Sequence, residues 1–195
     1  MKKPITLILK SKKTVFTFKD ISLLWGLTDR KSTIAGINYY VSTGDLYRIR
    51  RGIYAKDKDY DKVELASRIY TPAYVSFETV LARAGMIFQY YSQIFVASYL
   101  TREITIDAQA YVYRKIKDIV LTDPAGVMNQ EGISIATKER AFLDTLYINT
   151  DYHFDHLGGL DWDTVFDILP RYKNKRMAKK VHEHFDDFNA GEQKE

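Results

Sequence analysis

The sequence predicts an α+β protein made of two domains. Residues 17–55 follow the order helix, helix, β-hairpin, and residues 93–123 are rich in the β-branched and aromatic residues that favour strands. Between these regions, the stretch KDKDYDK at residues 56–62 is polar and densely charged. Because linkers between domains often have this composition, we expect an N-terminal domain at residues 1–58 and a C-terminal domain at residues 59–195.

The first strongly patterned helix follows Thr17. Thr17 and Asp20 have the spacing of a capping box, and Gly26 is expected to end the helix. Its apolar positions recur at helical spacing: Ile21, Leu24 and Trp25. A weaker pattern predicts one more helix before it, over roughly residues 4–11.

A second helix is expected within LTDRKSTIAGINYYVSTG. Thr28 or Asp29 is its N-cap and Gly44 its C-terminal stop. The positions expected to face the core are Ile34, Ile37 and Val41. A tight turn that contains Gly26 joins the two helices, which is the helix-turn-helix arrangement.

A β-hairpin follows directly. DLYRI and GIYA have strand composition, and Arg50, Arg51 and Gly52 form a short loop with a residue that tolerates positive φ. Helix, helix and hairpin in this order are typical of a winged helix-turn-helix. In that fold the second helix enters the major groove of DNA.

The C-terminal domain is predicted to be mixed α/β, with a β-rich centre and C-terminal helices. VELASRIY is expected to form a helix that stops before Pro72, and a second helix is expected to begin at a Ser76 cap and end at Gly85. Thr137 is expected to cap a helix that buries Ala141, Phe142, Leu146 and Tyr147. Strands are expected in QIFVASYL, REITIDAQAYVYRKI, DIVLTD and GISIA, and the last helices near 161–169 and 174–188.

Composition limits the class of protein. An apolar fraction of 46% is sufficient for a packed core, and the absence of cysteine excludes disulfides, thiolate nucleophiles and cysteine-based zinc sites. The net charge of +4 is uneven: residues 1–60 hold 13 Lys and Arg against 5 Asp and Glu, and the remainder holds 16 against 20. A basic N-terminal third indicates a polyanionic partner there.

We expect a cytoplasmic protein with no membrane segment. No stretch approaches the roughly 18 to 20 apolar residues that a spanning helix needs. MKKPITLILKSKK superficially resembles a signal peptide, but its apolar run has only about five residues, and no small-residue cleavage site follows.

The candidate DNA-binding residues lie on the second helix and the hairpin. Their side chains donate to phosphate or to base edges. They are Arg30, Lys31, Ser32, Asn38, Tyr39, Arg48, Arg50 and Arg51. Strict strand alternation would send Arg48 and Arg51 to opposite faces. The alternative is a solvated helix face beside a charged turn, or a basic module that contacts RNA or an acidic protein.

An enzymatic interpretation has weaker support. Asp107 and Lys115 faintly resemble the acidic and lysine residues of metal-dependent nucleases, which is the alternative function. Histidines lie close together in two places, but no HExxH is present, and His182 and His184 point about 200° apart on a helix. The four histidines are His153, His156, His182 and His184. We therefore expect no catalytic residue, cofactor or metal.

The segment between Tyr90 and Tyr113 is rich in aromatic residues. Aromatic residues are enriched at the centres of protein interfaces, so this segment could contribute to a partner-binding surface. They are also ordinary residues of a β-sheet, which is the simpler explanation.

Three segments together resemble the AbiEi-type antitoxins, the antitoxin half of abortive-infection (type IV) toxin-antitoxin pairs. STIAGINYYVSTGDLYRIRRGIYA resembles the N-terminal module of that family, and YVSFETVLARAGMI and ISIATKERAFLDTLY resemble later segments. The corresponding positions are Gly44, Leu46, Arg48 to Arg51, Gly52, Ile53, Tyr54, Ala55, Ala136, Glu139, Arg140, Ala141, Leu143 and Asp144. The resemblance does not extend to the final 45 residues.

The resemblance implies a function. It implies a winged helix-turn-helix that represses its own promoter by binding double-stranded operator DNA, and a C-terminal domain that counteracts a nucleotidyltransferase-like toxin. It does not imply direct contact with that toxin. Two copies on an inverted repeat would fit one helix-turn-helix per chain.

Overall fold

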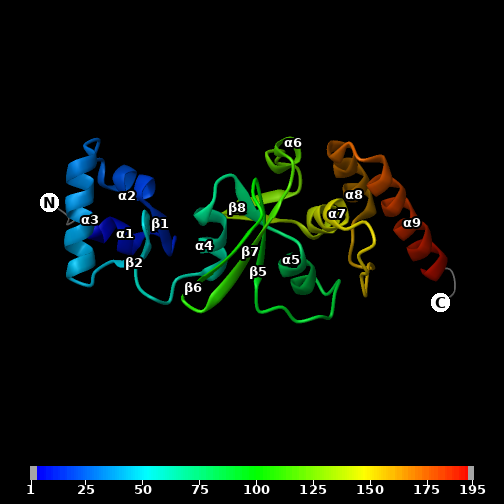
Figure 1. Ribbon diagram of the computed structural model, residues 1–195, viewed down its shortest axis with the longest axis horizontal. Helices are drawn as coiled ribbons and strands as arrows, with labels where there is room; N and C mark the ends of the chain where they lie inside the picture. The colour runs from blue at the N-terminus through cyan, green and yellow to red at the C-terminus, as the bar shows by residue number, and fades with distance from the viewer. Residues whose placement is uncertain (1–3, 193–195) are drawn as a thin grey trace. The chain divides into compact units, whose positions relative to one another are not determined.

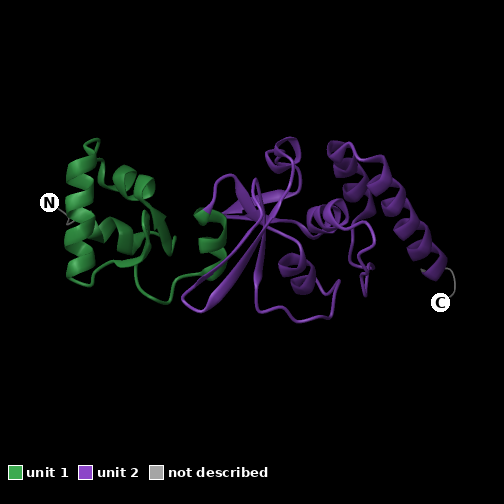
Figure 2. Ribbon diagram, in the orientation of Figure 1, with its two compact units in different colours: residues 1–69 green, residues 70–195 purple. Residues whose placement is uncertain are grey.

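The computed structural model of the chain describes residues 4–192 and divides into two compact units (Figure 2). Unit 1 is Met1–Ile69 and unit 2 is Tyr70–Glu195. Lys2 and Lys3, at the start of the segment that superficially resembles a signal peptide, lie outside the described residues. Each unit combines helices with a β-sheet, which confirms the α+β class. Within residues 4–192, no helix has both the length and the apolar character needed to cross a membrane.

Unit 1 places a small antiparallel sheet beside its helices (Figure 1). Its elements are α1 (Pro4–Lys10), β1 (Val15–Thr17), α2 (Phe18–Trp25), α3 (Arg30–Ser42), β2 (Tyr47–Arg50), β3 (Ile53–Ala55) and α4 (Lys62–Ile69). The strand order is β1-β3-β2. The sequence pattern does not predict β1, because a strand of three residues is too short to show alternation.

Capping residues fix the ends of α2 and α3. The backbone N–H of Asp20 donates to Oγ1 of Thr17 at 3.2 Å, and the backbone N–H of Thr17 donates to Oδ2 of Asp20 at 2.8 Å. Gly26 ends α2 at φ 63°, in the left-handed region. Asp29 accepts the backbone N–H of Ser32 at 2.7 Å and caps α3. These predicted boundaries are confirmed.

The core of unit 1 draws apolar side chains from the helices and the sheet. Its buried members are Ile5, Ile8, Phe16, Ile21, Ile37, Leu46 and Tyr54. From α3, Ile37 and Thr33 are buried, whereas Ile34 is 40% exposed. The expectation that Ile34 faces the core is therefore wrong. Thr33 can take the buried position because its hydroxyl donates to the carbonyl oxygen of Asp29 at 3.0 Å.

Gly36 lies where α3 passes Trp25 of α2, and a Cβ at this position would lie 2.8 Å from Cζ3 of Trp25. Gly36→Ala would gain about 1 kcal/mol in helix propensity, but overpacking against a large ring costs about 1 to 3 kcal/mol. We expect a net loss, seen as a lower melting temperature by circular dichroism. A higher melting temperature than wild type would show that the indole moves freely.

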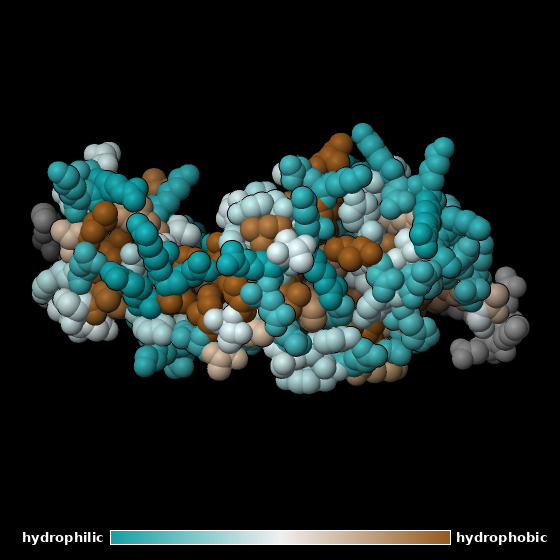
Figure 3. Space-filling view, viewed as in Figure 1, coloured by the Kyte–Doolittle hydropathy of each residue, from teal (hydrophilic) through white to brown (hydrophobic). Residues whose placement is uncertain are grey.

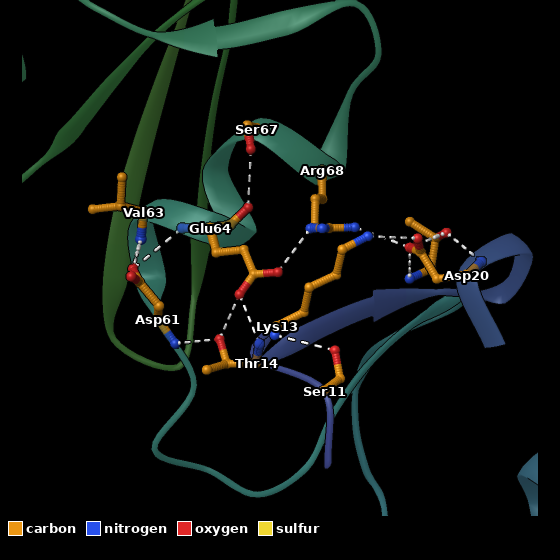
Figure 4. Close-up of polar contacts among 10 residues, drawn as sticks. Ser11, Lys13, Thr14, Asp20, Asp61, Val63, Glu64, Ser67 and Arg68 are labelled. Atoms are coloured by element: carbon orange, nitrogen blue, oxygen red, sulfur yellow. Dashed lines mark hydrogen bonds and ion pairs between the residues drawn. The ribbon is translucent and has the colours of Figure 1, made fainter. Parts of the chain in front are cut away.

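Helix α4 belongs to unit 1, although the expected boundary at residue 58 placed it in the C-terminal domain. Glu64 is buried and accepts both the backbone N–H and the hydroxyl of Thr14, each at 2.8 Å (Figure 4). Its other oxygen lies 3.1 Å from Nε of Arg68, and Nη1 of Arg68 lies 2.9 Å from Oδ2 of Asp20. A buried carboxylate requires such partners, and all of them lie in unit 1. The charged stretch 56–62 is therefore an internal connection of unit 1, and the units meet at residues 69 and 70.

Asp20 makes the stability of unit 1 sensitive to acid. Burial raises the pKa of Asp20, but hydrogen bonds from Thr17 and the charges of Arg68 and Lys13 outweigh burial and hold the pKa below 3.8. The stabilisation is therefore complete above about pH 4 and is lost as the pH falls through the lowered pKa. We expect Asp20→Asn to cost about 1 kcal/mol of unfolding free energy at pH 7, and progressively less as the pH falls below about 4. Urea titrations at a series of pH values measure this difference, and a difference that stays constant with pH would contradict it.

Unit 2 is built on a mixed six-stranded sheet with strand order β6-β7-β5-β4-β9-β8 (Figure 1). Its strands are β4 (Ala73–Val75), β5 (Ile94–Ser98), β6 (Arg102–Ile106), β7 (Gln109–Lys115), β8 (Val127–Gln130) and β9 (Ile133–Ala136). Its helices are α5 (Glu78–Arg83), α6 (Asp118–Leu121), α7 (Lys138–Ile148), α8 (Trp162–Ile168), the 3₁₀ turn η1 (Leu169–Tyr172) and α9 (Lys175–Glu192). Helix α7 packs against α5, α8 and α9.

Several predictions for unit 2 are confirmed and two are wrong. Thr137 caps α7, and α8 and α9 lie where helices were expected. DIVLTD forms α6 instead of the expected strand. Val120 and Leu121 are consecutive and both buried, so the segment lacks the alternation of buried and exposed side chains that a strand with one exposed face shows. Ser76 does not cap α5; its hydroxyl donates to Oδ2 of Asp144 at 2.8 Å.

A fully buried ion pair, Arg140 and Asp144, joins α7 to the sheet and to η1. Nε of Arg140 lies 3.2 Å from Oδ1 of Asp144, and neither side chain is exposed. The hydroxyl of Tyr172 donates to Oδ1 of Asp144 at 2.6 Å, and that of Tyr74 at 3.2 Å. Burial raises the pKa of both tyrosines well above the usual range, so both remain protonated donors. The other guanidinium nitrogens donate to the carbonyl oxygens of Val120, Asp123 and Ala125 and to the Tyr74 hydroxyl.

Candidate nucleic-acid interface

Helix α3 presents one stripe of side chains to the β2–β3 hairpin. Arg30, Ile34 and Asn38 recur at four-residue intervals and therefore lie on one helical face. The hydrogen bonds of Ser32 lower the pKa of the capping Asp29, so this carboxylate stays charged and keeps the first turn in place. The first turn of α3, which carries Arg30, is therefore held in place by these hydrogen bonds.

The pairing of the two hairpin strands is irregular near their arginines. Arg48 lies opposite Tyr54 while Arg50 lies opposite Ile53, so the register shifts between Arg48 and Arg50. Arg48 and Arg51 nevertheless line the same hollow, so the opposite directions that strict strand alternation would give them are not observed. Gly52 turns the chain at φ 81°, and its carbonyl oxygen accepts the N–H of Phe18 at 3.0 Å. That bond ties the hairpin turn to the start of α2.

A surface hollow of about 690 Å³ lies between α3 and the hairpin, and we call it the basic hollow. Its lining is Phe18, Arg30, Ile34, Asn38, Arg48, Arg51, Gly52 and Tyr54. Three arginines enter it, and none of the described residues that line it is acidic. Its chemistry is that of an anion site with several guanidinium donors.

Aromatic rings and one amide orient the guanidinium groups. Cζ of Arg30 lies 5.2 Å from the ring centre of Phe18, and Cζ of Arg48 lies 5.8 Å from that of Tyr54. Nη2 of Arg48 donates to Oδ1 of Asn38 at 2.7 Å, which links the hairpin to α3. Phe18 and Tyr54 are not among the residues predicted for the site. Thr17, next to Phe18, is predicted only as a helix cap, and Gly52, two residues before Tyr54, only as a turn residue.

Four of the predicted binding residues lie outside the basic hollow. Lys31, Ser32, Tyr39 and Arg50 are exposed, but none of them lines it. The Ser32 hydroxyl donates to Asp29 at 2.7 Å, and Tyr39 packs edge-on against Tyr40 while remaining 61% exposed. Of the eight predicted residues, the structure thus brings together Arg30, Asn38, Arg48 and Arg51.

The other candidate chemistries do not converge. Asp107 lies in the β6–β7 turn and Lys115 at the far end of β7, about 20 Å away at the usual rise per residue. His182 stacks on Phe166, and burial lowers the pKa of His184. Among residues 4–192, no group of three or more His, Asp and Glu is placed to hold a metal ion.

Comparisons by sequence add no relative. A scan of the chain against protein-family models finds no match, and a search of curated proteins also finds none. The candidate interface is therefore defined by the residues and distances given above.

Proposed function

We propose that unit 1 is a winged helix-turn-helix that binds duplex DNA, and that the protein is a transcriptional regulator. The observation that carries the proposal is the convergence of Arg30, Asn38, Arg48 and Arg51 on one hollow between α3 and the hairpin. Helix α3 acts as the recognition helix, and the β2–β3 hairpin is the wing. The strand order β1-β3-β2 supports the wing, since it pairs the hairpin with a strand that precedes α2.

The residues have separate tasks on DNA. Arg30, Arg48 and Arg51 bind backbone phosphate, for which planar guanidinium groups are well suited. The exposed side of α3, with Lys31 and Tyr39, enters the major groove. Asn38 pairs with an adenine edge when DNA phosphate draws Arg48 away from its amide oxygen.

A titration by fluorescence anisotropy tests the proposal. The probe is a labelled duplex taken from the DNA upstream of the protein's own gene. If the three arginines each neutralise about one phosphate, log K should fall with log salt at a slope of about −2.7 or steeper. Plasmid incubated with the protein and Mg²⁺ or Mn²⁺ should stay intact. Absence of binding at low salt, or cleavage of the plasmid, would contradict the proposal.

We also propose that the regulator is the antitoxin of a toxin-antitoxin pair and represses its own promoter in the cytoplasm. The support is the ordered likeness of three segments across residues 17–148 to the AbiEi-type antitoxins. The neighbouring open reading frame provides the test. A nucleotidyltransferase-like gene should lie beside this one, and its product should arrest growth unless this protein is co-expressed. Growth arrest that co-expression does not relieve would exclude the role.

A further inference from the structure

The N-terminal half of α9 and the turn before it carry a dense positive charge. Residues 171–180 contain six Lys and Arg and no Asp or Glu. The remainder of residues 70–195 contains eight Lys and Arg against eighteen Asp and Glu. The charge is therefore concentrated in one place on an otherwise acidic unit, and the face of unit 2 over α9 is mostly hydrophilic (Figure 3). We call residues 171–180 the α9 basic surface.

Ion pairs within the fold account for four of these six cations. Arg171 pairs with Asp123 at 3.1 Å, Arg176 with Asp151 at 3.7 Å, and Lys179 and Lys180 with Glu183 at 3.7 and 2.9 Å. Lys173 and Lys175 have no ion-pair partner among the described residues. Lys175 also begins an 18-residue helix, where the helix dipole makes a cation unfavourable. The surface therefore carries a cost in stability that an anionic partner would relieve.

An apolar hollow lies within the α9 basic surface. It has a volume of about 400 Å³, within the range of ligand pockets. Its lining is Leu169, Pro170, Lys173, Asn174, Lys175 and Ala178. Lys173 and Lys175 thus stand beside an apolar floor. This combination suits a ligand with one large apolar group next to negative charges.

The surroundings favour a short ligand over a long polyanion. Duplex DNA would extend past the α9 basic surface toward a unit whose other residues carry excess negative charge, and repulsion acts over about 8 Å at physiological salt. DNA also gains little from an apolar hollow. A peptide segment can place one side chain in the hollow and keep its carboxylates beside the lysines.

We propose that the α9 basic surface is a docking site for an acidic segment of another protein, anchored by one large apolar side chain in the hollow beside Leu169 and Ala178. Lys173 and Lys175 pair with its carboxylates. The site lies wholly in unit 2 and does not depend on the DNA-binding function. It gives the C-terminal helices a binding role.

Selection of a random twelve-residue phage-displayed peptide library on the intact protein tests the site. The selected peptides should be rich in Asp and Glu around a Leu or Phe. Two variants should weaken their binding at least about tenfold: Lys173→Glu with Lys175→Glu, which reverses the charge, and Ala178→Trp, which fills the hollow. Lys115→Glu with Lys117→Glu, an equal charge change at exposed positions of unit 2, should leave it within about twofold.

Four results would overturn the proposal. Selected peptides could lack acidic residues or bind all the folded variants equally. The Lys173→Glu, Lys175→Glu protein could lose affinity for DNA, which would make nucleic acid the occupant. Light scattering could show a dimer that only this variant abolishes, which would make a second copy the occupant. Thermal unfolding of each variant shows whether the fold is intact.

Discussion

Arg140→Met is expected to lower the unfolding free energy of unit 2 by about 3 to 5 kcal/mol. The substitution keeps an unbranched apolar stem but removes the cation beside the fully buried Asp144, and it leaves the carbonyl oxygen of Val120 without its donor. Urea unfolding measures the loss. The chain has two tryptophans, Trp25 in unit 1 and Trp162 in unit 2, so fluorescence in a Trp25→Phe background reports unit 2 alone.

Two controls separate the buried pair from a general effect of lost charge. Arg171→Ala removes a partly exposed arginine that pairs with Asp123, and it should cost no more than about 1 kcal/mol. Arg140→Met combined with Asp144→Leu should cost less than the sum of the single changes, because no unpaired charge stays buried. An Arg140→Met protein within about 1 kcal/mol of wild type would show that the ion pair does not hold unit 2 together.

Removing Arg48 and Arg51 together is expected to weaken DNA binding about tenfold to a hundredfold at moderate salt. Both guanidinium groups line the basic hollow, and an arginine that no longer neutralises a phosphate makes the salt slope shallower by about 0.9. The Arg48→Ala, Arg51→Ala protein should thus show a slope shallower by about 1.8. Both arginines are exposed, so its melting temperature should hardly change.

The matched control is Arg83→Ala with Arg102→Ala. These two arginines are exposed in unit 2, and their removal changes the net charge by the same amount. DNA affinity and salt slope should stay close to wild type. If both pairs of changes weaken DNA binding equally, overall charge rather than the basic hollow accounts for the affinity.

Local signals in the sequence predict much of unit 1. Thr17 with Asp20, Gly26 and Asp29 define helix ends through hydrogen bonds and φ preferences that involve only neighbouring residues. Features set by distant residues escaped prediction. The register shift between Arg48 and Arg50 appears only when β2 pairs with β3, and the shared hollow of Arg48 and Arg51 appears only in the folded unit.

The remaining errors have the same origin in long-range contacts. The stretch 56–62 has the composition of a linker, yet Glu64 and Arg68 bind Thr14 and Asp20 far back in the chain. Likewise, Ser76 is a good helix cap by type, but its hydroxyl is taken by Asp144 from α7. The sequence around Arg140 does not indicate that its side chain is buried. The carbonyl oxygens that accept hydrogen bonds from its guanidinium group belong to residues 120–125, which are distant in the sequence.

Site-specific cross-linking tests most directly whether the face formed by α3 and the β2–β3 hairpin contacts DNA. The chain has no cysteine, so Ala35→Cys and Asp59→Cys each offer one thiol for a benzophenone label. Ala35 is exposed on α3, whereas Asp59 follows β3, which runs away from the Arg51–Gly52 turn. We expect the label at residue 35 to cross-link to duplex DNA and the label at residue 59 to give little product. Equal cross-linking from both positions, or more from residue 59, would contradict the proposed DNA-binding face.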